Sequence, residues 1–256
     1  MGFFDLANPA FDLLDGWLAL IIGAAGRLAF WALLGSFATM FLYRLSSRQE
    51  ALSALKPRIK EAQKALATFD GELEEILPLV RRSLGLSARQ FGLALGPALL
   101  ASFPLIFLLL WISNRYDLVL PGPGAAITVR IDTAANSEAL WIPQASAKPI
   151  EQNQWQVSWP NDGDLLQLMV QGNSLVLKLP TTALSPVVHK HQWWNALIGN
   201  PAGYLDDDQP VEAVFLGLPT QAYLPFGPGW MRGWEFLFLG LLFSFSIAIK
   251  IVFKIH

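Results

Sequence analysis

The chain has 256 residues, of which 53% are hydrophobic and 15% charged, and its mean hydropathy is +0.40. This balance is too apolar for a purely soluble protein, and the absence of cysteine excludes disulfides and thiolate metal sites. The formal net charge of −2 excludes little by itself, but its distribution is uneven.

Residues 1–16 predict a short amphipathic helix that lies on the outer face of the membrane that the chain spans. Apolar residues stand beside Asp5, Asp12 and Asp15 at short helical spacing, and Asn8-Pro9 is a good helix start. We expect this helix to rest against the bilayer rather than to cross it.

Three apolar segments, at 17–43, 91–113 and 230–256, predict transmembrane helices, the last with a cytoplasmic tail. About 20 residues suffice to cross the bilayer core. The first segment is apolar except for Arg27, and the second contains Pro97 and Pro104, which membrane helices tolerate. The chain is therefore expected to be a three-span membrane protein.

Residues 44–90 predict a cytoplasmic antiparallel coiled-coil hairpin, because apolar residues follow a seven-residue repeat. A single unbroken helix of this length could not return to begin the second span, so we expect a turn at Thr68–Gly71. The repeat runs through Leu45, Leu52, Ile59, Leu66, Leu73 and Val80, with Leu55, Ala62, Phe69 and Ile76 three positions later.

Residues 114–229 predict a β domain with a sandwich-like arrangement. Short runs of β-type residues alternate with turn signals, and the clearest hairpin joins 165–171 to 174–179 through Gly172-Asn173. Expected strands cover 126–132, 155–159, 165–171, 175–179 and 211–218.

The charges predict the orientation in the membrane. Residues 44–90 carry nine bases and six acids, a net of +3, whereas residues 114–234 carry six bases and ten acids, a net of −4. Because cytoplasmic loops are rich in Lys and Arg, the hairpin and C-terminus are expected in the cytoplasm and the N-terminus and β domain outside. We expect a multi-pass protein of the bacterial inner membrane with a periplasmic β domain.

Two motifs then resemble the YidC/Oxa/Alb superfamily of membrane protein insertases. Leu55-Lys56-Pro57-Arg58-Ile59-Lys60-Glu61-Ala62-Gln63 is similar to the family's Leu-Gln-Pro-Lys-Ile-Lys-x-x-Gln, which begins its cytoplasmic hairpin. The segment 95–107, with prolines at 97 and 104, is similar to the family's Cys-Leu-Pro-Leu-Leu-Leu-Gln-Met-Pro-Ile-Phe. The resemblance covers 1–112 and, by topology, 230–256.

The resemblance implies a membrane protein insertase or chaperone that works without covalent chemistry. A hydrophilic groove receives the polar flank of a client, and the apolar part slides out between the second and third spans. Here the β domain replaces the two-helix hairpin that many members carry before the last span. The family's groove arginine stands about two helical turns nearer the hairpin motif than Arg27 does.

The groove candidates each have a structural alternative. Arg27 could hold the groove open, or it could snorkel to the outer headgroups or pair with Glu235. Small hydroxyls could line the same groove or simply pack helices together. These hydroxyl residues are Ser36, Thr39, Ser102, Ser244 and Ser246.

The nine hairpin bases could contact a ribosome, a nascent chain or anionic lipid, or could serve only to set topology. They are Arg44, Arg48, Lys56, Arg58, Lys60, Lys64, Arg81, Arg82 and Arg89. His189 and His191 near Asp206–Asp208 match no metal motif, and Trp193-Trp194 indicates core or a membrane-contacting edge.

The sequence predicts no catalytic residues, no cofactor, no metal and no DNA partner, and we do not expect an enzyme. The expected partners are the lipid bilayer and client membrane proteins. The main alternative is an accessory or scaffold subunit whose periplasmic β domain binds a fixed partner in a larger inner-membrane complex. A third possibility is a protein that handles a solute or lipid.

Overall fold

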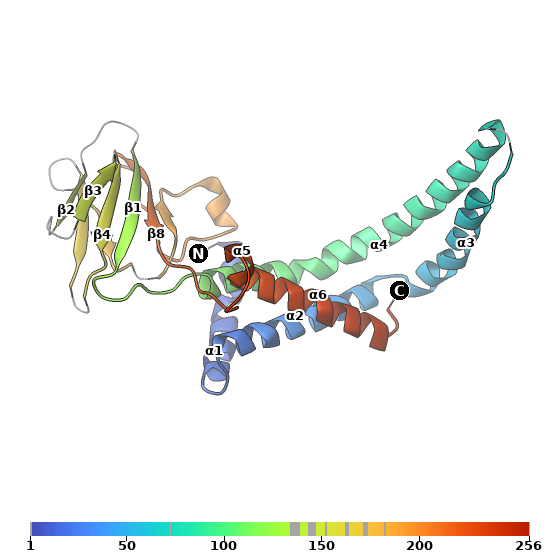
Figure 1. Ribbon diagram of the computed structural model, residues 1–256, viewed down its shortest axis with the longest axis horizontal. Helices are drawn as coiled ribbons and strands as arrows, with labels where there is room; N and C mark the ends of the chain where they lie inside the picture. The colour runs from blue at the N-terminus through green and yellow to red at the C-terminus, as the bar shows by residue number, and fades with distance from the viewer. Residues whose placement is uncertain are drawn as a thin grey trace. The chain divides into compact units, whose positions relative to one another are not determined.

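The structure is a computed structural model that describes residues 2–71, 73–133, 139–142, 147–151, 153–161, 164–170, 174–181 and 183–255. The chain forms two compact units. One comprises 1–24 and 109–236, and contains the N-terminal helices and the β domain. The other comprises 25–108 and 237–256 and is helical. Figure 1 labels the α-helices and several strands of the two units.

Three helices are long and apolar enough to cross a membrane: α2 (Ala24–Ser46), the segment Ile76–Tyr116 of α4 (Leu73–Tyr116) and α6 (Trp234–Val252). The first begins at Ala24 rather than at the predicted residue 17. Residues 17–19 instead end the preceding helix, α1, and a short break at 20–23 separates the two. The helix α4 continues through Pro97 and Pro104.

The helices of the second unit pack around Gly35 and Ser36 of α2, both buried. A Cβ atom on Gly35 would lie 3.0 Å from Leu108 Cδ2 and 3.4 Å from Leu242 Cδ1. Ser36 Oγ donates to the carbonyl of Leu242 at 2.9 Å as well as to that of Ala32 at 2.7 Å. Small residues thus let α2 approach α4 and α6 closely, as in membrane helix pairs.

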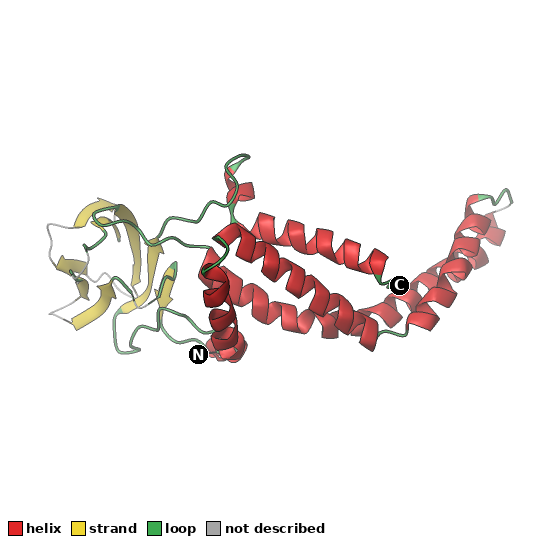
Figure 2. Ribbon diagram, turned by 90° about the horizontal axis from the view of Figure 1, so that it is seen from below, coloured by secondary structure: helices red, strands yellow, loops and turns green. Residues whose placement is uncertain are grey.

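Two helical arms follow α2. The first is α3 (Gln49–Ala67), and the second is the beginning of α4, which returns alongside α3 (Figures 1 and 2). Leu52, Leu55, Ile59 and Ala62 are the buried residues of α3. Their spacing of three and four residues gives one apolar stripe, and the polar remainder of the helix faces solvent.

In the first unit, the N-terminus forms the short 3₁₀ helix η1 (Phe3–Ala7) and then α1 (Asn8–Ala19), which has proline in its first turn. The last turns of α4, from Leu109, belong to the same unit. A four-residue helix, α5 (Gly229–Arg232), precedes α6.

The β domain contains two antiparallel sheets, drawn in yellow in Figure 2. The five-stranded sheet has the order β3-β4-β1-β8-β7, and the three-stranded sheet has the order β2-β5-β6. The strands are β1 (Ala126–Thr133), β2 (Ala139–Ile142), β3 (Ala147–Glu151), β4 (Gln154–Ser158), β5 (Leu166–Val170), β6 (Ser174–Leu179), β7 (Val187–His189) and β8 (Val211–Gly217).

Buried residues of both sheets form one hydrophobic cluster. In β1, every second residue is buried, namely Ile127, Val129 and Ile131, as a strand with one core face requires. Leu168 of β5 belongs to the same cluster. The register between β1 and β8 shifts at Asp132/Thr133, and such a bulge changes which residues of the strand face the core.

Each of the five predicted strands overlaps an observed one, and the hairpin of β5 and β6 is present. Its turn, Gly172-Asn173, lies outside the described residues. The sequence did not predict β2, β3 and β7. These have only four, five and three residues, and β3 contains Pro149 at a sheet edge, where proline is tolerated.

Candidate functional site

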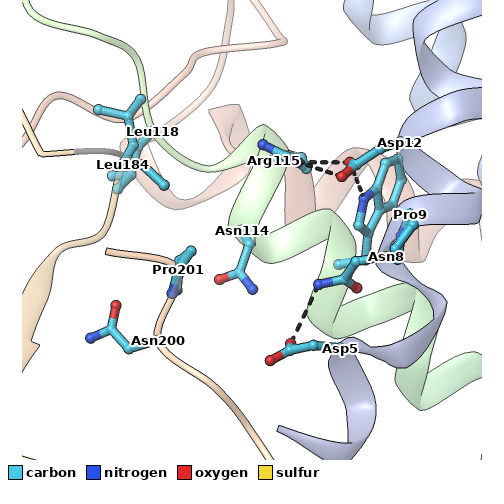
Figure 3. A pocket seen from close by; sticks show the side chains of 12 residues that line it. Asp5, Asn8, Pro9, Asp12, Asn114, Arg115, Leu118, Leu184, Asn200 and Pro201 are labelled. Carbon is cyan, nitrogen blue, oxygen red and sulfur yellow. Dashed lines mark hydrogen bonds and ion pairs between the residues drawn. The ribbon is translucent and has the colours of Figure 1, made fainter. Parts of the chain in front are cut away.

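The N-terminal helices, the end of α4 and two loops of the β domain enclose a pocket of about 460 Å³ (Figure 3). All of its lining residues belong to the first unit. The helices contribute Asp5, Asn8, Pro9, Asp12, Trp111, Asn114, Arg115 and the following Leu118, and the loops contribute Ala183, Leu184, Asn200 and Pro201.

Asp5 joins the N-terminus to the loop around Gly199. Its Oδ2 atom accepts hydrogen bonds from the backbone N–H groups of Gly2 at 2.7 Å and Gly199 at 3.1 Å, and Oδ1 accepts from Asn8 Nδ2 at 3.4 Å. Nearby, the N–H of Phe4 donates to the carbonyl of Leu197 at 2.9 Å. The buried carboxylate therefore fixes η1 to the β domain.

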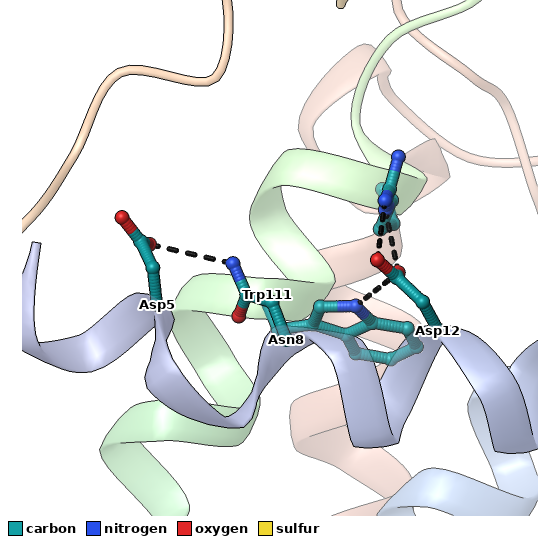
Figure 4. A network of polar contacts seen from close by, with 5 residues as sticks. Asp5, Asn8, Asp12 and Trp111 are labelled. Atoms are coloured by element: carbon teal, nitrogen blue, oxygen red, sulfur yellow. Dashed lines mark hydrogen bonds and ion pairs between the residues drawn. The ribbon is translucent and has the colours of Figure 1, made fainter. Parts of the chain in front are cut away.

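Asp12 joins α1 to the end of α4, as Figure 4 shows for Trp111. Trp111 Nε1 donates to Oδ1 at 2.8 Å, and Arg115 donates from Nε at 2.8 Å and from Nη2 at 2.6 Å. Burial raises the pKa of Asp12, but the hydrogen bonds from Arg115 and Trp111 and the Arg115 charge outweigh it, so the pKa lies below its ordinary value. The ring of Phe11 packs on Trp111, with centroids 5.4 Å apart.

A third contact comes from Asp15, which accepts a hydrogen bond from the Tyr116 hydroxyl. The carbonyl of Tyr116 in turn accepts a hydrogen bond from Tyr223 Oη at 2.8 Å, so the segment before α6 is held as well.

The residue after Tyr116, Asp117, has a raised pKa. Burial raises this pKa, the nearby Glu235 carboxylate raises it further, and a hydrogen bond from Trp234 only partly compensates.

The pocket offers binding groups rather than a nucleophile. The side chains of Asn8, Asn114 and Asn200 provide amide donors and acceptors, and its described lining includes no serine, cysteine, histidine, lysine or tyrosine. Asp12 and Arg115 neutralise one another. The asparagine amides can donate to and accept from a bound polar group, next to the apolar side chain of Leu184.

Three of the five predicted groove hydroxyls donate to backbone carbonyls. Ser36 is buried and both its hydrogen bonds go to backbone carbonyls, which fits the helix-packing alternative. Ser102 and Ser244 are exposed and bond to Ala98 and Gly240 on their own helices, at 2.8 Å in each case. Thr39 and Ser246 are partly buried. None of these five residues lines the pocket around Asp12 and Asn114, the pocket around Arg44 and Phe253, or the one around Trp159 and Asn161.

Arg27 lies in the first turn of α2, because the helix begins at Ala24. The prediction placed it about ten residues inside a span that began at residue 17. An arginine in the first turn reaches the headgroup region easily, so its position favours snorkelling over a role deep in the bilayer. The side chain is partly buried.

All nine hairpin bases are exposed: Arg44 lies at the end of α2, Arg48 lies just before α3, and the others lie on α3 and α4. Arg44 also lines a small pocket of about 90 Å³ with Phe37, Phe41, Ile249, Phe253 and Ile255. The hairpin therefore presents its charge to solvent while it buries the apolar stripe of α3.

The histidines pack on aromatic rings. His189 lies 5.1 Å from Trp194 and 5.8 Å from Tyr204, and His191 lies 4.9 Å from Tyr204, as ring centroids. No group of three His, Cys, Asp or Glu residues that could hold a metal occurs in the described parts of the chain. Trp193 is 82% exposed, so it is not a core residue.

The sequence analysis used Asp5, Asp12 and Asp15 only as the polar residues of a surface helix. The structure shows that all three are bonded to the rest of the first unit. Two signals were available: the acids fall on one helical face, and Arg115 follows directly on an apolar span.

Comparisons with known proteins identify no relative. No family model matches the chain, and neither a curated protein nor a solved structure matches it. The insertase resemblance therefore rests on the two motifs and on the order of the parts.

Proposed function

We propose that the protein is an insertase-like chaperone of the bacterial inner membrane, which assists the insertion or assembly of membrane proteins without covalent chemistry or a cofactor. The order of span, basic helical hairpin, span, β domain and span supports this proposal. Both resembling motifs lie within helices, 55–63 in α3 and 95–107 in α4.

The exposed basic hairpin is the observation that carries the proposal. Its two arms bury Leu52, Leu55, Ile59 and Ala62 and expose nine bases, and we propose that they form an antiparallel coiled coil in the cytoplasm. A positively charged, water-exposed projection can contact a nascent chain, the RNA of a ribosome or anionic lipid headgroups.

In the membrane, the client's route would pass between α4 and α6. Both helices expose large apolar side chains, including Leu99, Leu100 and Phe103 on α4 and Phe243 on α6. A polar client flank would first be received at the membrane surface, before the client's apolar part enters the hydrocarbon. Staged entry avoids the cost of burying an unpaired polar group in hydrocarbon.

The test is reconstitution in proteoliposomes with a client synthesised in vitro. Replacing Lys56, Arg58, Lys60 and Lys64 by glutamine should reduce client insertion, whereas the control Glu50→Gln/Glu61→Gln should not. Photo-crosslinkers at Leu99 and Phe243 should capture the client's apolar segment. Unchanged insertion by the glutamine variant, with no client adduct at either site, would contradict the proposal.

The second candidate is a scaffold subunit whose periplasmic, sandwich-like β domain binds a fixed partner. The pocket favours it, because the N-terminal helices and the end of α4 hold the β-domain loops around a lined cavity. Purification in mild detergent would then yield one partner in constant ratio. Loss of that partner in Asn114→Trp, which fills the pocket, would support the scaffold over the insertase.

A further inference from the structure

An uncharged apolar patch surrounds the contact between the N-terminus and the β domain. Its members are exposed, by 44% for Phe3, 69% for Leu6, 82% for Trp193, 47% for Leu197 and 37% for Ile198. We call these five residues the η1–η3 patch, because they lie on or next to η1 and η3 (Trp193–Ala196). Solvated surfaces rarely leave so large a tryptophan almost fully exposed beside other apolar side chains.

The two halves of the patch are fixed to one another. Phe4 N–H donates to Leu197 O at 2.9 Å, and Asp5 accepts from Gly199 N–H at 3.1 Å. A Cβ atom on Gly2 would lie only 2.5 Å from the Gly199 nitrogen, so the N-terminus is closely seated on this loop. The two segments that carry the patch are therefore held next to one another.

The patch continues along the N-terminal helix. Leu13 and Trp17 of α1 are 61% and 66% exposed, and with Phe3 and Leu6 they follow helical spacing along one side. The opposite side carries Asp5, Asp12 and Asp15, whose carboxylates bond to the protein. The usual arrangement of a surface helix in water is thus inverted, with acids inward and apolar residues outward.

Chain continuity indicates what covers this surface. Leu20 and Ile21, 86% and 83% exposed, lead directly into α2, which is long and apolar enough to cross a membrane. With α2 crossing a membrane, the end of α1 would lie at the level of the headgroups. The η3 segment has no Asp, Glu, Lys or Arg between His191 and Leu205. Tryptophan with aliphatic neighbours and no charge is the composition of an interfacial segment.

We propose that the η1–η3 patch is a membrane-docking surface, through which the β domain inserts Trp193, Leu197 and Ile198 into the outer leaflet next to the N-terminal helix. The β domain would then be held against the bilayer rather than tethered above it. The proposal requires only that the chain is membrane-anchored, so it applies to an insertase and to a scaffold alike.

The native chain contains no cysteine, so single-cysteine variants can test this directly. Trp193→Cys and, separately, Leu197→Cys would carry an environment-sensitive fluorophore in dilute phosphatidylcholine proteoliposomes that contain quencher-labelled lipids. Asn161→Cys, on an exposed polar loop of the β domain, is the matched control. Hydrogen exchange of β1 and β8 checks that each variant is folded.

The expected result is a blue-shifted emission and several-fold stronger lipid quenching at 193 and 197 than at 161. Quenching no stronger than that of the control, with free access to aqueous iodide, would overturn the proposal. A blue shift that depends on protein density and not on the quencher lipid would also overturn it, since the occupant would then be a second copy of the chain.

Discussion

Replacing Asp12 by alanine should loosen the N-terminal helix by about 2 kcal/mol. The change removes the acceptor of the Trp111 indole, a side chain that is only 1% exposed, and it removes a half-exposed bidentate ion pair with Arg115. An orphaned buried donor costs about 1–3 kcal/mol, and a solvent-exposed ion pair contributes at most about 1 kcal/mol. The adjacent pocket can admit water to the indole, so the lower part of this range applies.

Hydrogen exchange of residues 3–19, in the protein reconstituted in nanodiscs, measures this effect. A loss of about 2 kcal/mol corresponds to about 30-fold faster exchange of the segment. Asp12→Asn retains an acceptor for the indole, and so should show only about a fivefold increase. Exchange in β1 should not change, because the lesion is local.

A double-mutant cycle isolates the indole contribution. In a Trp111→Phe background, Asp12→Ala should cost no more than the ion pair, about 1 kcal/mol or less. If Asp12→Ala leaves exchange of 3–19 unchanged, or costs the same in both backgrounds, the reasoning about this network is refuted.

The same carboxylate predicts a pH dependence. The pKa of Asp12 is lowered in the folded protein, so the stability that this carboxylate contributes is fully present above the ordinary pKa of an aspartate, about 3.9. That stability is lost as the pH falls through the lowered pKa. Protection of 3–19 in the native protein should therefore persist at mildly acidic pH and disappear only in strong acid, and Asp12→Asn should lack this acid transition.

Three further predictions concern the rest of the fold. Leu168→Ala should lower the free energy of unfolding of the β domain by about 2–5 kcal/mol in denaturant, because Leu168 belongs to the core that both sheets share. Lys178→Ala, at an exposed position on the paired strand, should change this free energy by less than about 0.5 kcal/mol. Equal effects of the two substitutions would contradict the shared core. Gly35→Val should lower the stability of the detergent-solubilised protein in thermal unfolding by about 1–3 kcal/mol, because even a Cβ atom at this position would lie 3.0 Å from Leu108 Cδ2. Gly240→Ala should not lower it, because no atom lies within 4 Å of a Cβ added there. Because the pKa of Asp117 is raised in the folded state, the stability of the native protein should increase as the pH falls through that raised pKa. Asp117→Asn should stabilise the protein at neutral pH and flatten this pH dependence. An unchanged pH profile in the variant would show that Asp117 is not the group responsible.

The main elements of the fold could be predicted from the sequence where the physical signal is local. Apolar length predicts the three candidate spans, the seven-residue repeat predicts the buried stripe of α3, and alternation predicts β1. The predicted start of the first span was wrong because residues 17–23 are as apolar as a span, and hydropathy alone does not show where one helix ends and the next begins.

The site was less predictable, since its residues come from segments about a hundred positions apart. Asp12 and Arg115 meet only through tertiary packing, and neither has a motif. Ser36 and Ser102 show the converse problem: a hydroxyl in an apolar helix can bond to a carbonyl of its own helix, so residue type alone does not indicate a groove.

Accessibility of two single cysteines tests the membrane arrangement on which both proposed functions depend. Asp70→Cys marks the hairpin tip and Asn161→Cys marks the β domain, and both positions are exposed. In intact cells, a membrane-impermeant maleimide that can cross only the outer membrane should label position 161 and should reach position 70 only after the inner membrane is permeabilised. Labelling of both positions, or of position 70 alone, in intact cells would contradict the account.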